Sequence, residues 1–292
     1  MERPDWLSES LYPFDSQYFD SADGPLHYVE DGTGHPLLLV HGTPTWSFLY
    51  RKLIPRLSED YRVIAVDHLG FGLSAKPNDA GYTPQDHTQR LRSFIDYLGI
   101  AQFTLVVHDY GGPIGLSYAL QRPETVTRLV LFNTWMWSLA DDMTISVTSR
   151  LLRGWFGRLF YCRLNGSPRI LLKAGWGDET PLTDEVHRHY TNPFQSADER
   201  IAPLVLAREL IGSSGWYDSL WEQRSQIAHK PALVMWGLQD PAFDESYLER
   251  WESELSTATV HRLPETGHFV PDEAADCVSQ RMTEFLEESY AR

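Results

Sequence analysis

Cysteine is almost absent from this 292-residue chain, which has only Cys162 and Cys277, far apart in the sequence. Two distant cysteines form neither a disulfide framework nor a zinc cluster, so we expect a protein of the reducing cytoplasm. The first residues lack the basic and then apolar pattern of a secretion signal, and no apolar run approaches the ~18 residues of a membrane span. These absences predict a soluble cytoplasmic protein that is neither exported nor inserted in a membrane.

Positive charge is also scarce, because 25 Lys and Arg residues stand against 40 Asp and Glu residues, for a net charge of −15. Nucleic acids and anionic membranes both bind basic surfaces, so the sequence favours neither as a partner. An acidic balance of this kind is typical of a charge that keeps a protein in solution. Aromatic residues, in contrast, are plentiful: 13 Phe, 14 Tyr and 10 Trp exceed the usual need of a core and indicate a pocket for a small molecule.

Short apolar runs alternate with helix-like segments along most of the chain. Runs of this kind are typical of buried parallel strands, and their alternation with helices predicts an α/β fold with a mostly parallel, eight-stranded sheet. The predicted strands are Gln17–Asp20, Leu26–Glu30, Pro36–Val40, Arg62–Val66, Phe103–Val107, Val126–Phe132, Pro231–Gly237 and Thr257–Leu263. The predicted helices are Trp46–Leu57, Thr83–Leu98, a segment that ends at Gln121, Ser246–Leu255 and Glu273–Glu288. Ligands of such sheets bind beyond the carboxyl ends of the strands.

The alternation stops over residues 135–226, which contain six tryptophans and no strong strand signal. Helix-like spacing covers Ser146–Phe160 and Ser196–Ile211, and Ser196 with Glu199 forms a capping-box pattern. Pro203 leaves the start of that second helix open. We predict that residues 1–134 and 227–292 form the core domain and that residues 135–226 form an inserted helical cap.

The strand Phe103–Val107 is followed by His108, Asp109 and Tyr110 and then by a glycine-rich helix start. A charged residue between a central strand and a helix costs stability unless it has a role. This position is typical of a nucleophile elbow, in which a strained turn lifts one side chain above the sheet. The pivot of an elbow is usually Ser, whereas here it is Asp109. The alternative is a buried carboxylate that only caps the following helix.

Two further residues with catalytic chemistry follow later strands. Asp240 comes after the seventh strand, and His268 comes after the eighth. The order nucleophile, acid, histidine on alternating strands and helices is the α/β-hydrolase arrangement. Asn133 follows the sixth strand, where some related enzymes place the acid. Because an amide cannot carry that charge, Asp240 is the predicted acid.

A carboxylate nucleophile is suited to attack on saturated carbon. The attack forms an ester, whose carbonyl is open to hydrolysis, whereas a serine would form a stable ether. Carboxylates are ionised at neutral pH, so His268 is left to activate water in the second step, with Asp240 holding its tautomer. The backbone N–H groups of Thr43 and Tyr110 are expected to stabilise the tetrahedral oxyanion. These residue types predict displacement of a leaving group through an alkyl-enzyme ester on Asp109.

The chain resembles the haloalkane dehalogenases of the α/β-hydrolase superfamily along nearly its whole length. The resemblance rests on His41-Gly-Thr-Pro-Thr-Trp-Ser-Phe-Leu-Tyr-Arg51, Asp67-His-Leu-Gly-Phe-Gly-Leu-Ser-Ala-Lys-Pro77, Val107-His-Asp-Tyr-Gly-Gly112, Phe132-Asn-Thr-Trp-Met-Trp137, Trp236-Gly-Leu-Gln-Asp-Pro-Ala-Phe243 and Gly267-His268. It is closest to subfamilies with an Asp-Asp-His triad. The resemblance implies hydrolysis of small apolar haloalkanes by water to alcohol and halide, a detoxifying reaction without cofactor or metal.

The two positions that usually bind the leaving halide depart from the family. The residue after the nucleophile is normally Trp, whose indole N–H donates to the halide, and here it is Tyr110. The residue after His-Gly is commonly Asn or Glu, and here it is Thr43. A phenol and a shorter hydroxyl both donate hydrogen bonds, but from displaced positions. Trp137, at the start of the predicted cap, is a candidate for the missing indole donor, although packing at the junction of cap and sheet also explains it.

Other functions are compatible with part of the same pattern. Epoxide hydrolases also use an Asp nucleophile and need cap tyrosines to protonate the opening ring, and the cap here offers Tyr161, Tyr190 and Tyr217. The segment that begins at Thr43 is nearer to the dehalogenase form, so we rank that function first. A non-catalytic binding protein ranks last, because it would have no reason to keep all three triad residues.

Overall fold

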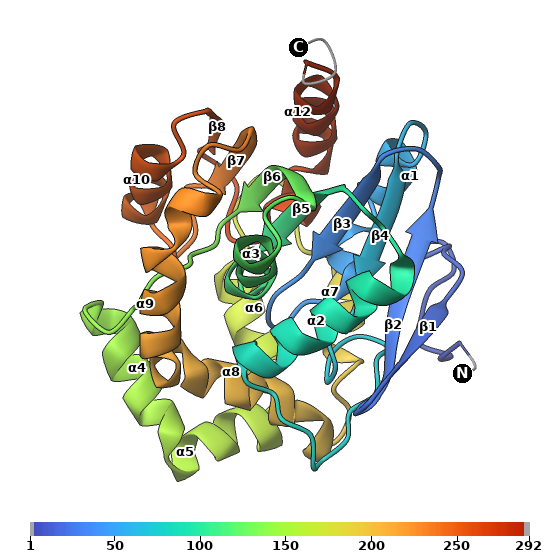
Figure 1. Ribbon diagram of the computed structural model, residues 1–292. Coiled ribbons are helices and arrows are strands. Elements are labelled where there is room, and N and C mark those ends of the chain that lie inside the picture. The colour runs from blue at the N-terminus through green and yellow to red at the C-terminus, as the bar shows by residue number, and fades with distance from the viewer. Residues whose placement is uncertain (1–2, 289–292) are drawn as a thin grey trace.

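The computed structural model describes residues 3–288 and contains one eight-stranded sheet (Figure 1). The strands are β1 Gln17–Ser21, β2 Gly24–Asp31, β3 Pro36–Val40, β4 Arg62–Val66, β5 Phe103–His108, β6 Val126–Phe132, β7 Ala232–Gly237 and β8 Ala258–Leu263. Their order is β1-β2-β4-β3-β5-β6-β7-β8. The β1/β2 and β2/β4 pairs are antiparallel and the other five pairs are parallel, so the predicted α/β fold and mostly parallel sheet are confirmed.

The central strands are apolar on both faces because helices cover both faces. Side chains alternate along a strand, so Leu105 and Val107 of β5 belong to one core cluster, whereas Val106 belongs to the other. The first cluster packs under α2 Pro84–Leu98 and α3 Gly111–Gln121. The second packs under α1 Ile54–Leu57 and α12 Ala275–Glu288. A fully buried sheet of this kind leaves only the strand ends free for chemistry.

Proline and glycine explain where helices differ from their predicted extents. The predicted helix over Trp46–Leu57 is instead a 3-10 turn, η1 Ser47–Tyr50, followed by α1. Pro55 lies in the first turn of α1, since its missing N–H and its ring exclude it from a helix interior. The predicted Ser146–Phe160 helix is broken at Gly154 into α4 Met143–Arg153 and α5 Trp155–Arg158.

The same effect shortens the helix predicted over Ser196–Ile211. Ser196 and Glu199 do form the two reciprocal capping bonds, at 2.6 and 3.3 Å. The regular helix, α8 Ile201–Gly212, nevertheless begins later, so that Pro203 lies in its first turn. The C-terminal helix predicted over Glu273–Glu288 begins two residues later, as α12, and a short helix, α11 Val270–Glu273, precedes it. The predictions over Thr83–Leu98 and Ser246–Leu255 agree with α2 and with α10 Glu245–Glu254 to within one residue.

Only helical elements occur between β6 and β7 among the described residues. They are α4, α5, η2 Leu159–Arg163, η3 Ser167–Leu171, α6 Leu172–Ala174, α7 Asp184–Thr191, η4 Asp198–Arg200, α8, α9 Ser214–Glu222 and η5 Arg224–Gln226. They gather on one side of the sheet (Figure 1). The hydroxyl of Tyr110, just beyond β5, donates to the carbonyl of Leu206 in α8, which places this helical segment over the carboxyl ends of the strands. Within residues 3–288, no helix is long and apolar enough to cross a membrane.

Candidate active site

Asp109 occupies a strained turn between β5 and α3. Its φ of +51° lies in the left-handed region, which non-glycine residues rarely adopt. The turn is held from both sides, since the Asp109 N–H donates to the Asn133 carbonyl at 3.1 Å and the Thr134 hydroxyl donates to the Asp109 carbonyl at 2.6 Å. A Cβ on Gly42 would lie 2.0 Å from Asp109 Oδ1, so only glycine leaves room for the carboxylate. This geometry is that of a nucleophile elbow.

The structure brings His268 and Asp240 to the same place. His268 Nδ1 lies 2.6 Å from Asp240 Oδ2, and His268 Nε2 lies 3.6 Å from Asp109 Oδ2. The second distance is an ion-pair contact slightly longer than a hydrogen bond. All three side chains are buried, with 5 to 7 % of each residue exposed. A histidine therefore stands between a carboxylate that orients it and a second carboxylate on the elbow.

Charge pairing dominates the protonation of this group. Burial by itself raises the pKa of Asp240, but the facing His268 outweighs it and holds that pKa below its usual value. Burial likewise opposes the charged form of His268, but the Asp240 and Asp109 carboxylates outweigh it and raise the pKa of His268 to about 10. His108 behaves in the opposite way, because burial and then the nearby His268 lower its pKa to about 3. His108 is therefore neutral and His268 holds the positive charge.

Asn133, which the sequence excluded as the acid, contacts Asp240. Its Nδ2 donates to Asp240 Oδ2 at 2.8 Å and to the carbonyl of Gly237 at 3.0 Å, and its Oδ1 accepts from the Gly237 N–H at 2.9 Å. The amide thus fixes the carboxylate on the neighbouring strand. The sequence signal that could have indicated this contact is the position of Asn133 at the end of β6, the strand beside β7.

Several neighbours fix the loop that carries His268. His108 Nε2 donates to the His268 carbonyl at 2.8 Å, and the His268 N–H donates to the carbonyl of Gly175 at 2.7 Å. The Glu273 carboxylate accepts from the N–H groups of Gly267, at 2.9 Å, and Phe269, at 2.8 Å, on either side of the histidine. Sequence reasoning missed His108 and Glu273, because their role depends on contacts across the fold.

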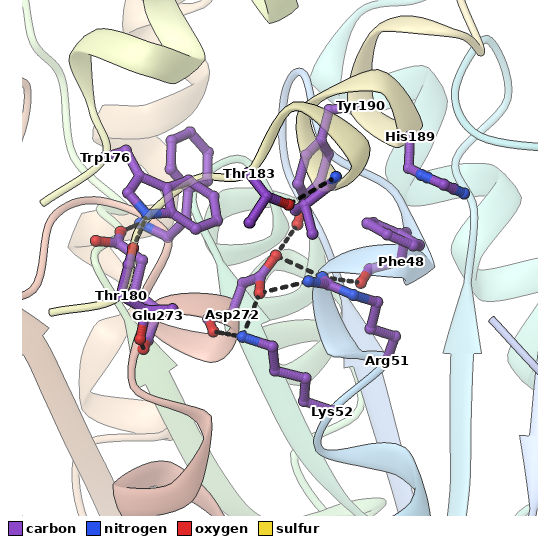
Figure 2. A network of polar contacts seen from close by, with 12 residues as sticks. Phe48, Arg51, Lys52, Trp176, Thr180, Thr183, His189, Tyr190, Asp272 and Glu273 are labelled. Carbon is purple, nitrogen blue, oxygen red and sulfur yellow. Dashed lines mark hydrogen bonds and ion pairs between the residues drawn. The ribbon is translucent and has the colours of Figure 1, made fainter. Parts of the chain in front are cut away.

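A buried ion-pair network lies next to this loop (Figure 2). Arg51 makes two hydrogen bonds to the Asp272 carboxylate, at 2.5 and 2.9 Å, and the Tyr190 hydroxyl donates to it at 2.6 Å. Lys52 donates to the Asp272 carbonyl at 2.8 Å. Figure 2 shows these groups converging on Asp272 beside Glu273, so the segment after β3, the segment after β8 and α7 are joined at one point.

The Thr43 backbone N–H points at the elbow and donates to Asp109 Oδ1 at 2.7 Å. Tyr110 is the N-cap of α3, so the partial positive charge of that helix end faces the same carboxylate. The Thr43 hydroxyl is buried and has no hydrogen-bond partner among the described residues. These groups are suited to stabilise negative charge on the Asp109 carboxyl.

The three side chains proposed for the halide lie in different places. The Tyr110 hydroxyl donates to the Leu206 carbonyl at 2.5 Å, which takes up its donor. The Trp137 ring packs on Trp221 and Trp251, at 4.9 and 5.3 Å, and its ring contacts within the described part of the chain include none of Asp109, Asp240 and His268. Thr43 is bonded to Asp109 through its backbone N–H, and its hydroxyl has no hydrogen-bond partner among the described residues.

Trp135, which sequence reasoning passed over, is a better-placed indole. Its ring lies 4.8 Å from that of Tyr110 and 4.9 Å from that of Phe243, and Phe243 lies 5.6 Å from His268. The residue is fully buried, and its Nε1–H has no hydrogen-bond partner among residues 3–288. A buried unpaired donor costs about 1–3 kcal/mol, which points to a ligand that satisfies it.

The cap tyrosines that an epoxide hydrolase would need are engaged elsewhere. Tyr190 donates to Asp272, and the Tyr217 hydroxyl donates to the carbonyl of Glu209 at 3.2 Å. Tyr161 is buried, and burial raises its pKa, which a hydrogen bond from Ser167 only partly opposes. Each of the three hydroxyls therefore has another partner.

The model of the α/β-hydrolase fold family matches residues 35–275, and the chain belongs to that family. Within it, the chain is a haloalkane dehalogenase-like hydrolase, as its sequence motifs indicated. It is 34 % identical to haloalkane dehalogenase 2 of Mycobacterium tuberculosis over 276 residues, which cover 94 % of this chain and 96 % of that protein. It is 33 % identical to a cis-3-alkyl-4-alkyloxetan-2-one decarboxylase of Shewanella oneidensis, over 97 % of this chain and 92 % of that protein.

Solved structures of dehalogenases have the same fold. The haloalkane dehalogenase DatA from Agrobacterium tumefaciens superposes with a TM-score of 0.85 at 25 % identity, covering 97 % of this chain and 99 % of that one. The haloalkane dehalogenase DbeA from Bradyrhizobium elkani gives a TM-score of 0.85 at 25 % identity, covering 96 % and 100 %.

Proposed function

We propose that this chain hydrolyses the carbon–halogen bond of small apolar haloalkanes through an ester on Asp109, with Asp240 and His268 completing the triad. One observation carries the proposal. A carboxylate in left-handed backbone conformation lies 3.6 Å from a histidine whose other ring nitrogen is bonded to a second carboxylate. A structural helix cap would need neither the strained backbone nor the histidine pair.

The two carboxylate oxygens of Asp109 have separate roles in this scheme. Oδ1 accepts from the Thr43 N–H, which leaves Oδ2 to attack the carbon and displace the halide. Water then adds to the ester carbonyl carbon, and the negative charge develops on Oδ1, where the N–H groups of Thr43 and Tyr110 stabilise it. Collapse of this intermediate releases the alcohol and restores the carboxylate.

His268 becomes a base only after the first step. In the free enzyme two carboxylates face it and raise its pKa to about 10, which favours the protonated ring. Esterification removes the negative charge of Asp109, so one of the two groups that retain the proton is lost and the pKa of His268 falls. The neutral ring then takes a proton from the attacking water, while Asp240 stabilises the imidazolium that forms.

Trp135 is our candidate for the leaving-group donor. Its Nε1–H is buried and unpaired beside Tyr110, whereas the Tyr110 hydroxyl is bonded to Leu206. We assign it, with Thr43, to the halide, in place of the Tyr110 hydroxyl and Trp137.

We also infer that residues 135–226 act as a cap on a core formed by residues 1–134 and 227–292. The argument is that helices alone occupy this segment and that α8 lies over the elbow. Because the triad is buried under this segment, bulk water is kept away from the ester.

A second candidate, suggested by the Shewanella oneidensis relative, is decarboxylation of an oxetan-2-one. Asp109 would attack the saturated ring carbon that is bonded to the ring oxygen, and the displaced carboxylate would stay tethered to the substrate. Loss of carbon dioxide would then form the alkene and expel Asp109, with no net water consumed. The altered halide positions favour this reaction, because a tethered leaving group needs no separate halide site.

Three substrates distinguish the candidates. Purified enzyme is incubated in parallel with 1,2-dibromoethane, a cis-3,4-dialkyloxetan-2-one and styrene oxide, and bromide, alkene and diol are measured. Bromide release is the expected result. Alkene without bromide would replace the dehalogenase proposal by the decarboxylase, and diol alone would replace it by the epoxide hydrolase. Inactivity on all three would contradict the proposal.

A further inference from the structure

The cap carries an extended apolar surface outside the candidate active site. Ten large hydrophobic side chains are exposed among the described residues, and nine of them lie between Met143 and Leu171. Isolated exposed hydrophobic residues are common on globular proteins, whereas nine in one segment mark a surface with a partner. We call residues 143–173 the cap surface.

The apolar side chains share one face of α4. Met143, Val147 and Leu151 follow at four-residue intervals, so they lie above one another on one side of the helix, with 79, 51 and 61 % of each exposed. Leu152 is on the buried side, in a small cluster with Leu204. Trp155, 77 % exposed, begins α5, and both helices lie at the outer edge of the molecule (Figure 1).

The charge of the cap surface is opposite to that of the rest of the chain. It contains six basic residues and no acidic one, which leaves −21 on the rest of the chain. The six are Arg150, Arg153, Arg158, Arg163, Arg169 and Lys173, and all are exposed. None of them belongs to an ion pair between described residues. The net charge on which the sequence argument against a membrane rested therefore hides a basic region.

These features favour a lipid surface over a second copy of the chain. A symmetric dimer through the cap surface would place its six cations against six identical ones. The neighbouring helices α4 and α5 expose Met, Val, Leu, Trp and Phe side chains with Arg residues among them, a composition typical of segments that lie in a membrane interface. At physiological ionic strength, charges more than about 8 Å apart are largely screened from one another. A bilayer in contact with the cap surface therefore interacts mainly with this segment and its immediate neighbours, which include Asp141 and Asp142.

We propose that the cap surface binds anionic phospholipid membranes, with Trp155 and the apolar face of α4 inserted among the headgroups and the basic side chains on the phosphates. The inference is independent of the reaction proposed above. The proposed attachment to the membrane is peripheral, since no described helix is long and apolar enough to span a membrane.

Vesicle flotation tests this inference with the full chain. Vesicles of equal parts phosphatidylglycerol and phosphatidylcholine, and vesicles of phosphatidylcholine alone, are mixed with the protein at low and at physiological salt. We expect flotation with the anionic vesicles that decreases with salt. Arg150→Gln with Arg153→Gln should weaken partitioning roughly fivefold for each Arg. Leu151→Asn with Trp155→Ser should weaken it at least about tenfold.

The matched control is Tyr97→Ser, which removes the tenth exposed hydrophobic side chain, in α2, where 56 % of the tyrosine is exposed. This variant should float like the wild type, and thermal unfolding checks that every variant is folded. Wild type that stays unbound, or a Leu151/Trp155 variant that floats equally well, overturns the inference. If the wild type stays unbound, a dimer in sedimentation velocity that this variant abolishes assigns the surface to a second copy. If the wild type binds neither vesicles nor a second copy, an acidic protein is the remaining candidate for the partner of the cap surface.

Discussion

In the proposed mechanism His268 acts as a base only in the second chemical step, so removing its imidazole should stop the reaction halfway. His268→Gln keeps a polar side chain but supplies no base for water, whereas Asp109 Oδ2 remains able to attack. We expect this variant to release one equivalent of halide and to retain the alkyl group on Asp109. Intact mass and peptide mapping after incubation with substrate measure the adduct.

Asp109→Asn is the control, because its amide is a poor nucleophile and should neither release halide nor gain mass. An unmodified His268→Gln protein, prepared beside a wild type that turns over the same substrate, would contradict the two-step scheme.

Trp135 is tested by replacing its indole with an aromatic ring that carries no N–H. Trp135→Phe should slow halide release about 10- to 100-fold, because loss of a preorganised donor raises the barrier where charge develops. The release of chloride should be slowed more than the release of iodide, because chloride is the poorer leaving group and depends more on stabilisation of its charge. Single-turnover halide release measures the effect.

Trp137→Phe is the matched comparison and should leave the rate of halide release near that of the wild type, because Trp137 packs on Trp221 and Trp251. If Trp137→Phe slows release and Trp135→Phe does not, the assignment of the donor is reversed.

At the residue scale, the proximity of the three proposed triad side chains was predictable from the sequence, and the residues that support them were not. Asp109, Asp240 and His268 were found because each follows a strand in a fixed order along the chain. Asn133 and Glu273 act through neighbours that are distant in sequence, so no local pattern identifies them. The position of an unpaired N–H cannot be read from sequence either, which is why Trp137 was chosen ahead of Trp135.

At the scale of elements, the Arg51–Asp272 pair ties η1 to α11. Arg51→Met would leave a buried carboxylate without its main partner and should lower the free energy of unfolding by about 3–5 kcal/mol. Activity should fall as well, since Asp272 lies four residues after His268. Urea denaturation measures the stability change.

The matched control is Arg56→Met, which breaks the exposed ion pair with Asp276 and should cost less than about 1 kcal/mol. Equal effects of the two substitutions would mean that the buried network does not hold the loop of His268.

The strands were predicted more accurately than the helices for a physical reason. The buried strands β3, β4 and β5 are largely uninterrupted apolar runs, whereas β1 and β8 are partly exposed and more polar, and all eight were located. Helix ends depend on single residues such as Gly154 and Pro203, and their effect on a helix depends on how the surrounding segment packs in the fold. The succession of short helical turns from α5 to α6 has no periodic signal long enough to predict.

At the scale of the whole molecule, His268 links stability to pH. Its pKa is about 10 in the folded protein and near 6.5 in an unfolded chain. Folding therefore binds a proton, so this contribution is complete below pH 6.5 and is lost as the pH rises towards 10. The gap in unfolding free energy between wild type and His268→Gln should shrink by on the order of 2–4 kcal/mol from pH 6 to pH 10.

Denaturation of both proteins at a series of pH values measures this gap. A gap that stays constant or widens towards pH 10 would show that the imidazolium is not stabilised by its carboxylates in the folded protein.

The segment proposed as the cap is bonded to the loop of His268 through residues 175–178. The His268 N–H donates to Gly175, the Asp178 N–H donates to the Glu265 carbonyl at 2.8 Å, and the Gly177 N–H donates to Glu273. A cap that lifted at this end would pull the base out of line with Asp240. We therefore expect residues 175–178 to stay in place during any opening of this segment, which keeps the base in line with Asp240. A substrate would then meet a hydrolytic machinery that is already assembled.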